Sequence, residues 1–250
     1  MSGDWSIVWP ALAAGLLVTL THAPLGMQVL QRGIVFIDLA VAQIAGLGVV
    51  FADWLGFEPS GVGVQIAALA AALVGALALN WTEKHWPDVQ EAVIGVSFIV
   101  AANVALLLLA ANPHGAEHMK DLLIGQILWV DPARLVAVAA ASVALLWTWL
   151  ALQPRIGRVG FYVLFACAVT LSVQLVGLYL VFTTLIVPAL ATRGYARGRL
   201  AACYVLGALG YAAGLGMSLA SDLPPGPLIV CAMTAFGAVL FALGPRVARV

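Results

Sequence analysis

Long apolar segments, each about as long as a bilayer core is thick, alternate with short clusters of charge along this chain. A helix needs about 20 mostly apolar residues to cross a membrane. Only 9% of the residues are charged, whereas a soluble domain carries about 25%. The pattern predicts an all-α integral membrane protein with a single transmembrane domain over residues 1–250. The expected spans are residues 5–24, 34–55, 62–81, 92–111, 133–152, 199–219 and 226–244.

One apolar run, between Arg158 and Arg193, is longer than one span and shorter than two. Both flanks are basic and are therefore expected on the cytoplasmic side, so the run must enter and leave the membrane within about 34 residues. Gly177 and Pro188 interrupt it. We expect a full helix followed by a short, broken or re-entrant return, in a polytopic bundle of about seven to nine helices. Residues 177–190 become a candidate pathway element, because irregular backbone at membrane depth needs protein or a water-filled cavity around it.

The distribution of basic residues predicts the orientation. Cytoplasmic loops of membrane proteins carry the excess of Lys and Arg. Nine of the eleven basic residues fall in one alternating set of loops and tails, with Lys120 and Arg134 as the exceptions. This predicts a multi-pass inner-membrane protein with its N-terminus outside and its C-terminus in the cytoplasm. The nine residues are Arg32, Lys84, Arg155, Arg158, Arg193, Arg197, Arg199, Arg246 and Arg249.

Two function classes find no support in the sequence. The net charge is zero and no basic run occurs, which argues against a nucleic-acid-binding surface. The sequence contains no Walker A phosphate-binding loop, so any ATP hydrolysis would occur on another chain. We therefore expect a protein that is not itself an enzyme.

A carboxylate lies inside the second expected span. An ionised Asp at the centre of a membrane helix is costly and commonly functional, so Asp38 is a candidate cation or proton site that faces the bundle interior. Alternatively it lies in a wet cytoplasmic vestibule, because Arg32 is only about a turn and a half away. Asn103 and Gln174 lie near the middle of their spans. They either line a translocation path or form interhelical hydrogen bonds.

The expected outer loop after the fourth span contains His114, Glu117 and His118 in the order H-x-x-E-H, an inverted zinc-protease pattern. Proteolysis would require both histidines on one helix face, whereas Pro113 and Gly115 favour a loop. Two other interpretations stay open: an ordinary solvated loop, and a weak outer loop that receives a metal.

Taken together, these segments resemble the permease subunits of the ABC importers for zinc, manganese and iron. The stretch RGIVFIDLAVAQIAGLGVVFA is similar to the family's second-helix signature, and EAVIGVSFIVAANVALLLLA to the start of its fourth span. LLIGQILWVD matches a short Leu-x-Gly segment, and LSVQLVGLYLVFTTLIVPALAT carries the family's VG…PA spacing. The similarity covers almost the whole chain.

The resemblance implies one of two transmembrane subunits, here a homodimer, with a cytoplasmic ATPase and an extracytoplasmic binding protein as partners. The transported substrate would be a divalent metal, zinc first and manganese second, and no cofactor would be bound permanently. By the resemblance Asp38 belongs to the metal path, together with the helix breaks at Gly177 and Pro188. The expected contacts with the ATPase are Arg155, Arg158, Arg193 and Arg197.

The chain departs from the family in two places. The family commonly has a His four residues after the second-helix Asp, whereas this chain has Ala42. The family also has a longer cytoplasmic stretch before the VG…PA region, whereas only QPRIGRVG separates Leu152 from Phe161. The short stretch favours an alternative function, an ATP-independent carrier of metals or small solutes that has kept the permease fold.

Overall fold

The computed structural model describes residues 2–58, 61–109, 127–152, 156–221 and 223–245. Every regular element in these ranges is helical, and seven of the helices are long and apolar enough to cross a membrane. The prediction of an all-α, polytopic membrane protein is confirmed. By contact the chain divides into two compact units. The first unit comprises Met1–Arg32, Ile124–Ala144 and Leu175–Val250, and the second comprises Gly33–Leu123 and Leu145–Gln174.

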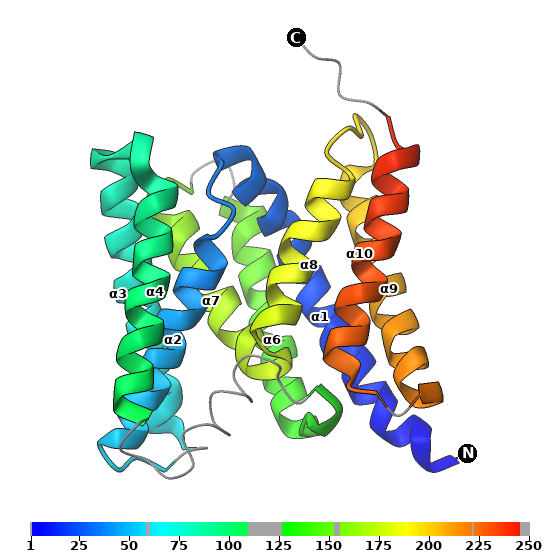
Figure 1. Ribbon diagram of the computed structural model, residues 1–250, viewed down its shortest axis with the longest axis horizontal. Coiled ribbons are helices and arrows are strands. Elements are labelled where there is room, and N and C mark those ends of the chain that lie inside the picture. The colour runs from blue at the N-terminus through cyan, green and yellow to red at the C-terminus, as the bar shows by residue number, and fades with distance from the viewer. Residues whose placement is uncertain (1, 59–60, 110–126, 153–155, 222, 246–250) are drawn as a thin grey trace. The chain divides into compact units, whose positions relative to one another are not determined.

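The helix bounds agree closely with the expected spans except at α1, which is longer than expected. Figure 1 traces the helices from blue at the N-terminus to red at the C-terminus. They are α1 (Ser2–Arg32), α2 (Ile37–Trp54), α3 (Val62–His85), α4 (Gln90–Leu109), α6 (Pro132–Leu152), α7 (Arg158–Val176), α8 (Leu178–Ala191), α9 (Arg199–Ser221) and α10 (Pro225–Leu243). Short 3₁₀ turns, η1 (Pro87–Val89) and η2 (Ile127–Trp129), precede α4 and α6.

Close helix packing in the first unit depends on glycines. α1 packs against α8 and α9, and α10 packs against α8 and α9 (Figure 1). A side chain at Gly26 would collide with the backbone carbonyl of Leu185 on α8. A side chain at Gly214 would meet the backbone of Ile229 on α10. The small residues therefore bring helix backbones together, as is common in membrane bundles.

The second unit is built around α2, which packs against both α3 and α4. Gly48 of α2 lies against the carbonyl of Ala67 on α3, so a Cβ atom would not fit there. On the other side, Val50 of α2 forms a buried cluster with Ala105 and Leu109 of α4. These contacts hold the helix that carries Asp38.

The long apolar run folds as a full helix followed by a short return, as the sequence predicts. α7 has 19 residues and α8 has 14. They meet at Gly177, whose φ of +88° belongs to the region that favours glycine. The second predicted interruption, at Pro188, is wrong, because α8 continues through Pro188 to Ala191. A proline inside a membrane helix is tolerated where neighbouring groups satisfy the backbone that it frees.

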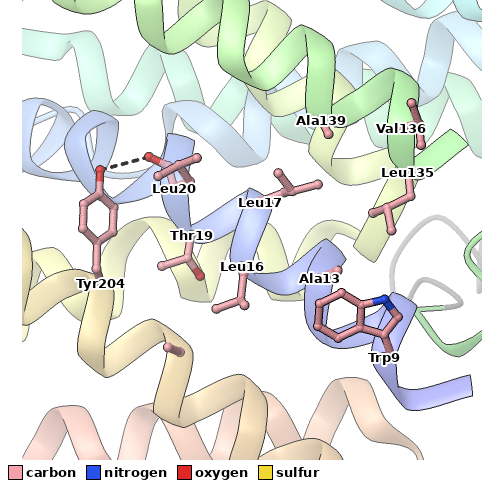
Figure 2. Close-up of a pocket in the computed structure, with 11 residues that line it drawn as sticks. Trp9, Ala13, Leu16, Leu17, Thr19, Leu20, Leu135, Val136, Ala139 and Tyr204 are labelled. Carbon is pink, nitrogen blue, oxygen red and sulfur yellow. Dashed lines mark hydrogen bonds between the residues drawn. The ribbon is translucent and has the colours of Figure 1, made fainter. Parts of the chain in front are cut away.

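α1 shows how such a backbone group is satisfied. This helix continues well beyond the expected end at residue 24, through Pro24 to Arg32. Proline has no N–H, so the carbonyl four residues earlier, that of Leu20, loses its helical partner. The hydroxyl of Tyr204 on α9 donates a hydrogen bond to this carbonyl at 3.2 Å (Figure 2). A side chain from another helix thus lets α1 continue through the proline.

We expect Tyr204→Phe to lower the thermal unfolding midpoint of the purified chain in lipid nanodiscs. Loss of the hydroxyl leaves the Leu20 carbonyl without its donor, at a cost of about 1 kcal/mol. The control is Tyr179→Phe, which removes an exposed hydroxyl from α8 and is expected to leave the midpoint unchanged. Equal midpoints for Tyr204→Phe and the wild type would contradict this role.

Candidate functional site

Asp38 is the second residue of α2, and its side chain is completely buried. Within the described ranges, no side chain donates a hydrogen bond to either carboxyl oxygen. The first turn of a helix has backbone N–H groups that the helix does not use, and the helix dipole favours a negative charge there. The burial does not fit the wet-vestibule alternative. It leaves a carboxylate inside the bundle whose oxygens can bind a cation.

The turn that leads into α2 is held by the start of α4. Glu91, in the first turn of α4, accepts a hydrogen bond from the backbone N–H of Val35 at 2.6 Å. Phe36, the residue before α2, provides no side-chain cap of its own. Glu91 therefore fixes the entry into α2 from a neighbouring helix. It acts as a positioning residue for Asp38.

α4 is in turn attached to the end of α3. The buried side chain of Gln90 donates a hydrogen bond to the carbonyl of Leu79 at 3.0 Å and accepts one from the hydroxyl of Thr82 at 3.0 Å. These two bonds use both ends of the amide. Together with Glu91 they connect α3, α4 and the start of α2.

The structure brings only some of the predicted path residues into one unit. Asn103 belongs to α4, which packs against α2, although the structure does not describe its side chain. Gln174 lies in the last turn of α7, also in the second unit, and is half-buried. Gly177 and Pro188 belong to the first unit. A role in the path stays a prediction for all four residues.

The basic residues predicted to contact an ATPase have different surroundings. The Nε of Arg158 lies 3.8 Å from the Oε2 of Glu83, at the end of α3, and the Arg158 side chain is about half exposed, at 47%. Arg193 is exposed and its guanidinium lies over the Phe241 ring, 4.7 Å from the ring centroid. Arg197 is exposed in the loop between α8 and α9. Arg155 lies outside the described residues, as do the outer-loop residues His114, Glu117 and His118.

His22, which the sequence analysis did not single out, is a second completely buried ionisable residue. It lies inside α1, ten residues before the end of the helix at Arg32. In the described part of the chain its Nε2 has no hydrogen-bond partner. A histidine within an otherwise apolar span is a visible sequence signal, because ionisable residues are rare in spans.

An apolar cavity of about 580 Å³ lies in the first unit, between α1, the beginning of α6 and α9. Figure 2 shows Trp9, Leu17 and Leu135 among its lining residues. Its lining contains no charged side chain, so it is unsuited to a cation. Within the described residues, no three His, Cys, Asp or Glu side chains come together as a metal site. A bound metal would therefore need ligands beyond a preformed cluster of these side chains.

Comparison with known proteins agrees with the resemblance. The model of the ABC 3 transport family matches residues 4–153 and 148–243. The chain is 23% identical over 260 residues to the high-affinity zinc uptake system membrane protein ZnuB of Haemophilus influenzae, covering 95% of this chain and 98% of that protein. It is 25% identical over 242 residues to an uncharacterized membrane protein of Synechocystis, covering 88% of this chain and 84% of that protein.

The fold has a solved counterpart. The structure of PsaBC from Streptococcus pneumoniae in complex with Fab contains a chain similar to this one, with a TM-score of 0.75 and 20% sequence identity. The match covers 96% of this chain and 92% of that chain. A multi-pass helical bundle that matches the model of a transport family is a membrane permease. This chain belongs to the ABC 3 transport family.

We expect Glu91→Ala to lower the thermal unfolding midpoint, because the N–H of Val35 loses its acceptor. The cost should be about 1 kcal/mol, as for an ordinary hydrogen bond, because this bond is only partly buried. The matched control is Glu91→Gln, whose amide oxygen can still accept this bond and which should retain most of the stability. Equal destabilisation by the two substitutions would show that the carboxylate acts by its charge and not as this acceptor.

Proposed function

We propose that this chain is the transmembrane permease subunit of an ABC-type importer for a divalent metal, zinc first and manganese second. The observation that carries the proposal is the buried carboxylate of Asp38, at the start of a membrane-spanning helix, in a chain of the ABC 3 transport family. The name of the Haemophilus relative, a high-affinity zinc uptake protein, supports zinc. The metal is the transported substrate.

The helix order supports an orientation with the N-terminus outside and the C-terminus in the cytoplasm of the inner membrane. With α1 running inward, its end at Arg32 lies on the cytoplasmic side. Alternation then puts the end of α3 at Lys84, the start of α7 at Arg158 and the loop with Arg193 and Arg197 on the same side. Positive charge on that side agrees with the usual bias of cytoplasmic loops.

In the proposed transport cycle, a homodimer opens alternately to the two sides of the membrane. The proposed path residues are Asp38, Asn103, Gln174, Gly177 and Pro188. The carboxylate of Asp38 makes the path favourable to cations and unfavourable to anions. The break at Gly177 separates α7 from α8, so the two helices can change their relative angle without unwinding either one.

Transport energy comes from a separate cytoplasmic ATPase, and an extracytoplasmic binding protein delivers the metal. Arg155, Arg158, Arg193 and Arg197 contact the ATPase, and His114, Glu117 and His118 belong to the face that receives the metal. The exposure of Arg193 and Arg197 supports the first assignment. The second candidate function is an ATP-independent carrier, favoured by the short connection between the end of α6 at Leu152 and the start of α7 at Arg158.

The energy source is tested by uptake of radioactive zinc or manganese into vesicles that contain this chain, its ATPase and its binding protein. We expect uptake that requires ATP and stops when the ATPase is omitted. Zinc flux through this chain alone, without ATP, would instead establish the carrier. The empty vesicle is the control for metal bound to lipid.

The role of Asp38 is tested by Asp38→Asn, which keeps the shape of the side chain and removes its charge. We expect metal uptake to fall at least about tenfold, because an amide is a much weaker ligand than a carboxylate for Zn²⁺ or Mn²⁺. The amount of chain in the membrane should not change. Asp88→Asn, in the exposed turn before α4, is the control. Unchanged uptake at matched expression would refute the role of Asp38.

A further inference from the structure

The two ring nitrogens of His22 have different surroundings, because Nδ1 has polar neighbours and Nε2 has no hydrogen-bond partner among the described residues. Its Nδ1 lies 3.1 Å from the backbone carbonyl oxygen of Val18, one turn earlier in α1, and 2.9 Å from the hydroxyl oxygen of Thr21. A carbonyl oxygen only accepts hydrogen bonds, so Nδ1 must carry the proton that it donates to Val18. In the neutral ring, Nε2 then carries a free lone pair.

This free nitrogen is completely buried. Across the described ranges, the Nε2 of His22 accepts no hydrogen bond. A buried polar atom without a partner costs about 1–3 kcal/mol, and the cost is harder to avoid where no bulk water is present. The arrangement therefore suits a ligand that occupies the site only transiently and binds through the lone pair of Nε2.

His22 lies on the inner face of the first unit. At 100° per residue, positions 15, 19, 22 and 26 share one face of α1. On this face, Gly15 lies against Tyr211 of α9, and Thr19 lies against Gly207 of α9. Gly26 lies against Leu185 of α8. Ten residues separate His22 from the end of α1 at Arg32, which places it about 15 Å along the helix from that end. Its ring is therefore inside the bundle, at membrane depth.

We propose that the Nε2 of His22 binds the transported divalent metal and forms an intramembrane station of the transport path. The inference rests on the proposed function. A metal-binding histidine typically donates its other ring N–H to a carbonyl or carboxylate, which fixes its tautomer and raises its basicity. Val18 fills this role for His22. Imidazole is a good ligand for Zn²⁺, whereas Mn²⁺ favours oxygen ligands, so His22 favours zinc over manganese.

The sequence allows a direct test, because it contains four histidines: His22, His85, His114 and His118. Replacing the last three with Gln leaves His22 as the only imidazole, provided that the purification tag contains no histidine. We would load this full-length variant with ZnCl₂ in lipid nanodiscs and record zinc X-ray absorption. We expect the scattering of one imidazole in the shell of the bound zinc. Its absence would overturn the proposal, and this measurement does not depend on any substitution at His22.

The second measurement is zinc affinity, by competition with a chromophoric chelator. His22→Gln keeps a group that can donate to Val18 and removes the ring nitrogen, and we expect it to weaken zinc binding at least about tenfold. The control is His85→Gln. The Nδ1 of His85 lies 2.8 Å from the carbonyl of Trp81, four residues earlier, so His85 has the same local arrangement on an exposed part of α3. Zinc affinity should not change in this control.

Uptake by the complete transporter separates this inference from the proposed function. We expect His22→Gln to reduce zinc uptake more than manganese uptake. If the wild-type complex takes up zinc and His22→Gln leaves both affinity and uptake unchanged, the station at His22 is refuted while the importer stands. If the wild-type complex transports neither metal, the proposed function fails, and the inference fails with it.

Discussion

The structure depends on one constraint, that backbone polar groups inside a membrane must be satisfied without water. Regular helices meet it locally. Where they cannot, side chains complete the hydrogen bonding: the hydroxyl of Tyr204 reaches the carbonyl that Pro24 leaves free on Leu20. Pro24 is therefore compatible with a continuous α1. Hydroxyls inside the bundle are paired as well: that of Thr184 in α8 donates to the carbonyl of Leu180 at 2.6 Å and contacts the hydroxyl of Tyr211 at 2.9 Å.

Among the buried polar atoms without a hydrogen-bond partner in the described residues, two groups belong to completely buried residues whose chemistry suits a metal. The carboxylate of Asp38 and the Nε2 of His22 are both completely buried and both lack a side-chain partner within the described residues. They differ in chemistry, since a carboxylate is a hard oxygen ligand and an imidazole is a borderline nitrogen ligand. A path with one ligand of each kind would attract cations generally and hold zinc more selectively. Each group is positioned by its neighbours: Asp38 follows the turn that Glu91 of α4 fixes, and the ring of His22 is held by the carbonyl of Val18.

The spans could be predicted because the hydrocarbon core imposes both length and apolar character on a helix. The start of α3 at Val62 and of α9 at Arg199 agrees with the predicted boundaries. The break at Gly177 was predictable because the run between two basic flanks had to turn back within its length. The helix break predicted at Pro188 is wrong, because from the sequence alone a proline within an apolar run indicates the end of a helix. In the bundle, α8 continues through it.

The sequence by itself determined that the chain is a helical membrane protein, where most of its helices lie, and that one of them carries an acidic residue. These properties are local, since each follows from the composition of a segment of about 20 residues. The tertiary structure decided which polar groups are paired. Tyr204 and Leu20 are 184 positions apart, and Glu91 and Val35 are 56 apart. No local pattern predicts such pairs, because they depend on which helices pack together and in what register. For the same reason, only the structure shows that His22 has one ring nitrogen without a hydrogen bond, whereas in another fold both of its nitrogens could be paired.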